Sequence, residues 1–160
     1  MENVVSVNSI SHRFGDFTAV NQLSFEVHSQ EIFGLLGPNG AGKTTTILLM
    51  IGLLGLDEGE IQVLGLDPQQ QARQVHQCIG YVPQETNVYL DLSAVDNLGH
   101  HAALYCEDLS IVEDKIEEIL KLMSLWERRN DALRTYSGGM KRRLAHARTL
   151  LHDAEVIFFD

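Results

Sequence analysis

The chain has 160 residues, enough for one domain, and its 44% hydrophobic and 21% charged residues allow an ordinary buried core. Its 22 acidic residues against 12 basic ones give a net charge of −10, which disfavours nucleic-acid binding because phosphate neutralisation needs a basic surface. The most apolar stretch, residues 47–56, is about half as long as a membrane-spanning helix. The first residues lack the cationic and apolar regions of a signal peptide. We therefore expect membrane association only through a partner.

The first half of the chain is predicted to consist mostly of strands. Alternating or continuous apolar runs bounded by turn residues favour strands at residues 4–10, 23–27, 32–36, 60–64 and 79–82. Residues 43–54 have no helix-breaking residue before Gly52 and favour a helix. A glycine-rich loop therefore lies between a predicted strand and a predicted helix, which is the arrangement of a phosphate-binding loop.

The second half is predicted to be mainly helical. Ser93 is a candidate N-cap for a helix that runs towards Tyr105, and Ser137 is a candidate start for another. The helix between them has an apolar face made of Val112, Ile116, Ile119, Leu120 and Met123. Its acidic residues lie off that face, which favours a solvated surface over a metal site. An apolar strand then ends at Asp160, so the element order favours an α/β core with a helical subdomain.

The strongest functional signal is the glycine-rich loop, which matches the pattern G-x-x-x-x-G-K-[ST]. Its glycines allow backbone N–H groups to face phosphates, and the next helix points its positive end at the same anion. Lys43 would supply a charge to the outer phosphates, Thr44 a hydroxyl to Mg²⁺, and Thr45 a contact to an inner phosphate. The predicted nucleotide contacts of the loop are Gly37, Pro38, Asn39, Gly40, Ala41, Gly42, Lys43, Thr44 and Thr45.

Three shorter features follow, and each is weak on its own. Ser137, Gly138 and Gly139 open a helix, and this combination is either a second anion site or an ordinary helix start. Asp160 ends an apolar strand, where a carboxylate either holds Mg²⁺ through water or is a simple strand-end acid. Gln84 follows the strand predicted at residues 79–82 and carries little information alone.

Taken in this order and spacing, the motifs make the whole chain resemble the ATP-binding cassette (ABC) family. The glycine-rich loop is similar to the family's Walker A loop, and Asp160 to the end of its Walker B strand. Gln84 occupies the position of the Q-loop glutamine, and residues 137–140 resemble the signature motif. Phe14 resembles the aromatic residue that stacks on adenine, with Phe17 as a weaker candidate.

The resemblance implies a P-loop core with an antiparallel β subdomain and a helical subdomain. The core and β subdomain would comprise residues 1–84 and 154–160, and the helical subdomain would comprise residues 85–153. ATP and Mg²⁺ would be the cofactors. The implied catalytic residues are Lys43, Gln84 and Asp160, and the implied Mg²⁺ ligands are Thr44, Gln84 and Asp160. In a pair of such domains, ATP would lie between one Walker A loop and the partner's Ser137, Gly138 and Gly139.

The signature reads Tyr-Ser-Gly-Gly-Met at residues 136–140, where the family commonly has Leu-Ser-Gly-Gly-Gln. This variant, with Phe-Gly-Leu-Leu at residues 33–36, resembles the daunorubicin-resistance-like exporter branch. The expected role is an ATP-binding subunit at the inner face of the cell membrane, bound to membrane-spanning permease subunits and paired with a second nucleotide-binding domain. The alternatives are a soluble ABC ATPase of DNA repair or translation and a non-functional fragment.

The family's catalytic glutamate follows the Walker B aspartate and polarises the attacking water. The 160 residues stop at Asp160, and the family's D-loop and switch histidine also come later. A general base typically contributes 10²–10⁴-fold to a rate. We therefore expect this chain by itself not to hydrolyse ATP.

Overall fold

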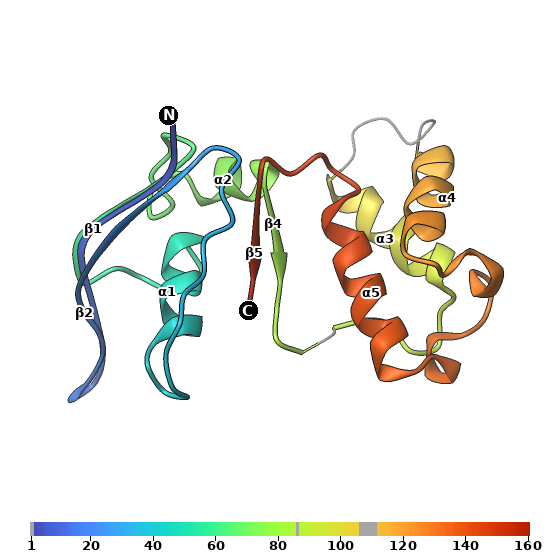
Figure 1. Ribbon diagram of the computed structural model, residues 1–160, viewed down its shortest axis with the longest axis horizontal. Coiled ribbons are helices and arrows are strands. Elements are labelled where there is room, and N and C mark those ends of the chain that lie inside the picture. Colours follow the sequence, from blue (N-terminus) through green and yellow to red (C-terminus); the bar gives the residue numbers. More distant parts are fainter. Residues whose placement is uncertain (1, 86, 106–111) are drawn as a thin grey trace. The chain divides into compact units, whose positions relative to one another are not determined.

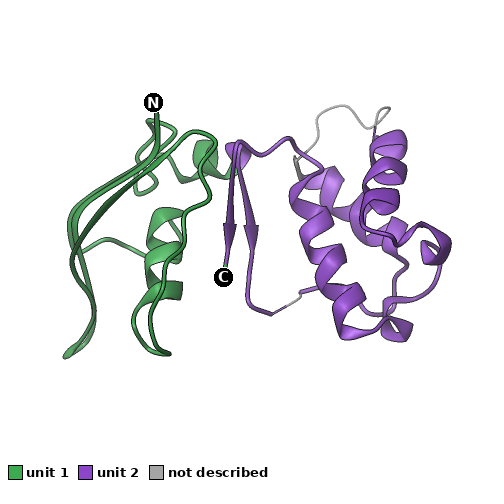
Figure 2. Ribbon diagram, viewed as in Figure 1, with its two compact units in different colours: residues 1–76, 160 green, residues 77–159 purple. Residues whose placement is uncertain are grey.

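The computed structural model describes residues 2–85, 87–105 and 112–160, and the chain forms two compact units. The first unit contains residues 1–76 together with Asp160, and the second contains residues 77–159 (Figure 2). The subdomain boundary that the family resemblance implies at residues 84 and 85 stays a prediction. Within the described ranges, every helix is too short or too polar to cross a membrane.

A three-stranded antiparallel sheet dominates the described part of the first unit (Figure 1). Its order is β2-β1-β3, with β1 at Asn3–Phe14, β2 at Phe17–His28 and β3 at Glu58–Val63. Alternate residues of a strand face one side of the sheet, and Val5 and Val7 of β1 are buried in this way. Ile10 is also buried, and it follows a register shift of the strand after Val7. The strands expected at residues 4–10, 23–27 and 60–64 are confirmed, and β1 and β2 extend well beyond their apolar segments.

Helix α1, Lys43–Met50, follows the glycine-rich loop and buries Thr46, Ile47, Leu49 and Met50. It ends before the predicted end at residue 54, because Gly52 adopts a left-handed φ of 70°. A Cβ at this glycine would lie 2.3 Å from the carbonyl oxygen of Pro68, so the chain turns tightly here. Helix α2, Ala72–Cys78, has no counterpart among the elements predicted from the sequence.

The strand predicted at residues 32–36 is wrong, because this segment has no strand pairing among the described residues. Ile32 and Leu36 are almost fully exposed, at 101% and 96%. Phe33 is partly covered by Phe25, and their stacked rings have centroids 4.9 Å apart. An apolar run predicts burial, but a strand also needs a hydrogen-bonded neighbour, and the run itself does not supply one.

The second unit contains a short parallel sheet and a group of helices (Figure 1). Strand β4, Ile79–Val82, pairs in parallel with β5, Val156–Phe159. The apolar runs predicted both strands but not their pairing. The helices are α3 at Ala94–Tyr105, α4 at Val112–Leu122 and α5 at Gly138–Thr149, with 3₁₀ turns at Trp126–Arg128 and Leu133–Thr135. Their shared core includes Leu98, Leu120, Leu125, Leu133, Leu144 and Leu151, each at most 1% exposed.

The helix starts of the second unit confirm the predicted N-caps. The hydroxyl of Ser93 accepts the N–H of Asp96 at 3.1 Å, and the Asp96 carboxylate accepts the N–H of Ser93 at 3.3 Å. The hydroxyl of Ser137 accepts the N–H of Met140 at 3.3 Å, which starts α5. The predicted apolar face of α4 is also confirmed, since Val112, Ile116, Ile119 and Leu120 are buried.

Candidate nucleotide-binding site

The glycine-rich loop between residues 37 and 42 is an exposed, tightly turned segment. The N–H of Ala41 donates to the carbonyl oxygen of Pro38 at 3.2 Å. Gly40 and Gly42 both have a φ of 84°, a left-handed conformation that glycine adopts without strain. Gly42 has a second constraint, because a Cβ there would lie 2.3 Å from the carbonyl oxygen of Ala19 in β2. The loop therefore requires glycine both for its conformation and for its close approach to the sheet.

Helix α1 starts without a capping side chain. Its N-cap is Gly42, which has no side chain that could accept a hydrogen bond. The N–H and the hydroxyl of Thr46 both donate to the Gly42 carbonyl oxygen, at 2.8 and 2.9 Å. The first N–H groups of a helix have no acceptor within the helix itself. Together with the positive end of the helix dipole, the N–H groups of Lys43, Thr44 and Thr45 favour an anion at the loop.

The side chain of Lys43 folds back over the glycine-rich loop. Its Nζ donates to the carbonyl oxygens of Gly37 and Pro38, at 2.9 and 2.8 Å. An ammonium group has three N–H donors, and these two bonds use two of them. A phosphate oxygen on the loop could therefore take the third donor without breaking either bond.

Thr44 and Asp160 lie 116 positions apart in the sequence, yet their side chains meet in the first unit. The hydroxyl of Thr44 donates to Oδ1 of Asp160 at 2.7 Å. Hydroxyl and carboxylate oxygens are hard ligands of the kind that Mg²⁺ prefers. This pair fits a magnesium ion in its donor chemistry, and it combines two of the three metal ligands expected from the sequence.

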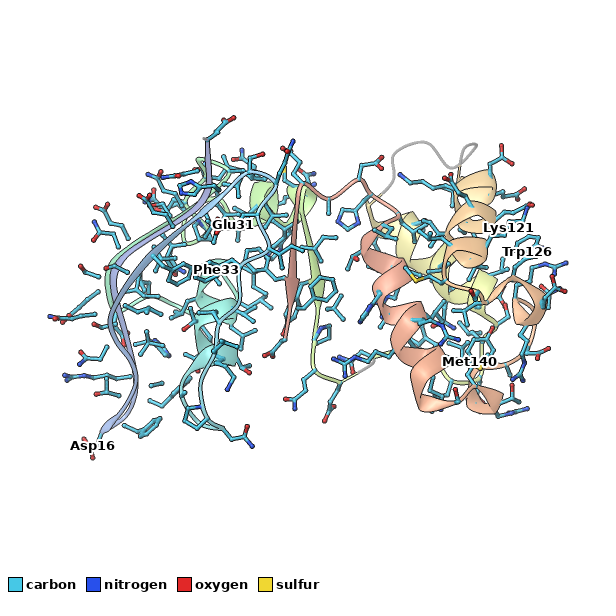
Figure 3. All side chains as sticks on the ribbon, viewed as in Figure 1. Asp16, Glu31, Phe33, Lys121, Trp126 and Met140 are labelled. Carbon is cyan, nitrogen blue, oxygen red and sulfur yellow. The ribbon has the colours of Figure 1, made fainter. Side chains whose placement is uncertain are left out.

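Both candidates for adenine stacking lie at the tip of the β1–β2 hairpin, which Asp16 marks in Figure 3. Phe14 pairs with Phe17 across the turn, where Gly15 has a φ of 58°. Phe14 is 50% exposed and Phe17 is 61% exposed. Exposed aromatic rings of this kind can stack on a nucleotide base.

The other predicted site residues belong to the second unit. Gln84 is exposed shortly after β4, and Ser137, Gly138 and Gly139 are exposed at the start of α5. A Cβ at either glycine would meet no atom within 4 Å, so a ligand or partner can approach the backbone closely. The structure thus brings the loop, Thr44 and Asp160 together in one unit and places Gln84 and the serine–glycine turn in the other.

A sequence model of the ABC transporter family matches residues 20–160. The chain belongs to the ABC transporter family. This confirms the resemblance drawn from its motifs.

Curated ABC relatives match nearly the whole chain. The linearmycin resistance ATP-binding protein LnrL of Bacillus subtilis is 38% identical over 157 residues, which are 98% of this chain and 50% of that protein. The Nod factor export ATP-binding protein I of Cupriavidus pinatubonensis is 35% identical over 157 residues, 98% of this chain and 48% of that protein. The chain therefore spans about half the length of these ABC relatives.

Solved structures of ABC proteins share the fold. An ATP-binding subunit of an ABC transporter superposes with a TM-score of 0.87 over 98% of this chain and 65% of the other, at 24% identity. CbiO1 of Clostridium perfringens, part of the ABC transporter complex CbiONQ, superposes with a TM-score of 0.88 over 100% and 66%, at 19% identity. These similarities confirm the expected ABC fold, an α/β domain with an antiparallel β subdomain.

Sequence reasoning missed the contacts that Arg128 makes with the turn before α5. Its guanidinium donates to Asp131 at 2.8 Å and to the Thr135 hydroxyl at 3.0 Å, and it lies 5.4 Å from the ring centre of Tyr136. The Tyr136 hydroxyl donates back to the Arg128 carbonyl at 2.7 Å, and Arg128 also contacts the sulfur of Met140, labelled in Figure 3. Only the Arg128–Asp131 pair has a helical i,i+3 spacing, and the sequence carries no signal for the contacts of Arg128 with Thr135, Tyr136 and Met140.

Arg148 on α5 makes a second set of contacts that sequence reasoning missed. It donates to the backbone oxygen of Asn87, three residues after Gln84, and its Nε lies 3.4 Å from Nδ1 of His101 on α3. Burial, followed by the positive charge of Arg148 and the proximity of His152, lowers the pKa of His101 to about 4. His101 is therefore neutral near pH 7, and its Nδ1 can accept a hydrogen bond from Arg148. Arg148 thus ties the segment after Gln84 to two helices of the second unit.

Proposed function

We propose that this chain binds ATP and Mg²⁺ as part of the ATP-binding subunit of an ABC exporter. One observation carries the ATP-binding proposal. The uncapped start of α1, the Lys43 ammonium and the Thr44–Asp160 pair all lie around one short loop of the first unit. This combination provides N–H donors, a cation and hard oxygen ligands, which are the groups that a magnesium–triphosphate complex needs.

Each group has a proposed role in binding. The loop and the first N–H groups of α1 hold the phosphates, and Lys43 contacts the outer ones. Thr44 and Asp160 hold Mg²⁺, which neutralises phosphate charge, and Gln84 of the second unit is a further proposed ligand. Phe14 stacks on adenine. Among these residues, Lys43, Gln84 and Asp160 are the ones that would stabilise charge during phosphoryl transfer.

The signature residues are proposed to serve a second nucleotide-binding domain. Ser137 caps α5 through Met140, so its hydroxyl oxygen is held at the positive end of that helix. Gly138 and Gly139 are exposed, which allows a phosphate to approach the backbone. We therefore propose a pair of domains in which each signature turn contacts ATP bound to the other domain.

The exporter assignment is supported by the relatives whose names refer to linearmycin resistance and Nod factor export. We propose that the subunit lies at the inner face of the cell membrane and acts on separate membrane-spanning permease subunits. The glutamate that orients water in the family follows the Walker B aspartate and is outside these 160 residues. The activity proposed for these 160 residues is binding of ATP and Mg²⁺.

The binding proposal is tested by titrating the chain with a fluorescent ATP analogue and Mg²⁺. Hydrogen bonds to charged groups contribute roughly 1.5–3 kcal/mol, so Lys43→Ala should lower the affinity at least about tenfold. Lys121→Ala is a matched control, because it removes the same charge from an exposed pair with Glu117 on α4. Equal affinities of Lys43→Ala and Lys121→Ala would contradict the proposal.

A further inference from the structure

Asp57 lies just before β3 but contacts the end of β1. Its Oδ2 accepts the N–H of Arg13 at 2.7 Å and lies 3.4 Å from Nδ1 of His12. Its own N–H donates to the carbonyl oxygen of Ser11 at 3.3 Å. One residue therefore contacts three consecutive residues of β1, directly before Phe14.

His12 extends this contact to Phe14. Side chains two positions apart on a strand lie on the same face, and these two rings meet edge to face with centroids 4.6 Å apart and planes at 87°. His12 is 8% exposed, whereas Phe14 is 50% exposed. The buried imidazole thus supports the exposed ring on one side and leaves part of that ring accessible to a ligand.

The hairpin tip needs such support because regular strand pairing weakens there. The last pair between β1 and β3 joins Ser11 to Glu58, so the residues beyond Ser11 are paired only with β2. The β1–β2 register also shifts on both sides of His12. Two-stranded ribbons are only marginally stable on their own, and irregular pairing reduces their hydrogen bonding further. On the edge of β1 that faces away from β2, Asp57 supplies the hydrogen bond that β3 no longer provides.

We infer that Asp57 and His12 are positioning residues that hold Phe14 in place for stacking on a nucleotide base. This inference rests on the proposed ATP binding and adds two residues to the site. A ring that is already fixed loses less conformational entropy when a base stacks on it than a mobile ring does. Asp57 acts on the base only through β1 and His12, so the phosphate-binding loop should not depend on it.

The test compares two ligands by isothermal titration calorimetry, ATP and inorganic tripolyphosphate, each with Mg²⁺. Tripolyphosphate has phosphates but no base. Alanine substitution of an aromatic residue that stacks on a base costs about 5- to 150-fold in affinity, so Phe14→Ala should weaken ATP binding in this range and leave tripolyphosphate binding unchanged. Asp57→Ala should weaken ATP binding severalfold, again without affecting tripolyphosphate.

Two further variants separate positioning from general stability. Asp57→Asn keeps an acceptor for the Arg13 N–H and should bind ATP almost as the parent does. His12→Leu keeps an apolar side chain but removes the ring, and it should weaken ATP binding selectively even if Asp57→Ala does not fold. Amide hydrogen exchange gives a readout without ligand, since the Arg13 N–H should exchange faster in Asp57→Ala than in the parent.

The outcomes distinguish this inference from the proposed function. If Asp57→Ala and His12→Leu weaken both ligands equally, or neither ligand, the inference is wrong, because the residues then act on general stability or not at all. If Lys43→Ala leaves tripolyphosphate affinity unchanged, the phosphate-site assignment fails, and the inference falls with it. Lys43 should affect both ligands, whereas Asp57 should affect only ATP.

Discussion

Gly42→Ala and Gly40→Ala form a matched pair of substitutions in the glycine-rich loop. Both glycines have a φ of 84°, so each variant forces alanine into the same left-handed conformation. They differ in their surroundings, because the new Cβ at residue 42 would lie 2.3 Å from the carbonyl oxygen of Ala19, whereas the one at residue 40 meets no atom within 4 Å. The effect of the substitution on the unfolded chain is the same in both variants and cancels.

The structure sets the expected size of this difference. A left-handed conformation costs a non-glycine residue roughly 1–2 kcal/mol, and Gly40→Ala should lose about this much stability. In Gly42→Ala the loop and β2 must also separate by about 1 Å to reach an ordinary contact, and overpacking of this kind costs a further ~1–3 kcal/mol. The free energy of unfolding should therefore fall by roughly 2–5 kcal/mol in Gly42→Ala, the sum of the two terms.

Urea denaturation followed by circular dichroism measures both unfolding free energies, and nucleotide titration measures the functional effect. Gly42→Ala should also bind ATP more weakly than Gly40→Ala, because the clash displaces the first turn of α1 and its N–H groups. Equal urea midpoints for the two variants would refute the reasoning, since they would show that the approach of Gly42 to Ala19 has no energetic consequence.

Three other predictions follow from the site and from the second unit. Thr44→Val removes the hydroxyl next to Asp160, so ATP affinity should depend less on Mg²⁺ in titrations with Mg²⁺ and with EDTA, and an undiminished dependence would contradict the ligand assignment. Gly138 has open space around it, so Gly138→Asp should fold and bind ATP normally. Its added negative charge repels phosphate, so light scattering should show that it does not pair with a second domain. Normal pairing would contradict the signature role. Unfolded His101 titrates near 6.5 and folded His101 near 4, so the unfolded chain binds more protons between these values and stability falls as pH drops through them. His101→Gln keeps an acceptor for Arg148 and should make the urea midpoint less dependent on pH in this window, and an unchanged pH dependence would contradict the low pKa.

Local signals predicted the elements that depend on local interactions. The caps at Ser93 and Ser137 each act within four residues of the chain, so sequence spacing was enough to place both helix starts. The end of α1 was predicted too late because Gly52 makes its tight turn against Pro68, a contact that the sequence does not reveal. Residues 32–36 show the same limit, since their apolar pattern predicts a strand while pairing depends on a partner elsewhere.

The candidate site likewise contains residues that local sequence patterns predict and residues whose contacts depend on distant parts of the chain. The glycine-rich loop has enough local chemistry to be recognised alone, and residues 37–45 were all predicted from the pattern. The proposed metal role of Asp160 rests on the family's order of motifs, because its contact with Thr44 joins residues 116 positions apart. The contacts of Asp57 with β1 and of Arg148 with Asn87 were invisible, since they depend on where β3 and α5 place ordinary charged residues.

The exposed apolar segment at residues 32–36 also affects how the chain behaves in concentrated solution. Ile32, Phe33 and Leu36 are exposed on a segment without charge or proline, and such segments can pair with copies of themselves. The net charge of −10 opposes this by repulsion between molecules, but salt weakens that repulsion beyond a distance of about 10 Å at 0.1 M. The colloidal stability of the chain should therefore decrease as ionic strength rises, and Phe33→Lys should reduce this sensitivity by placing a charge within the segment.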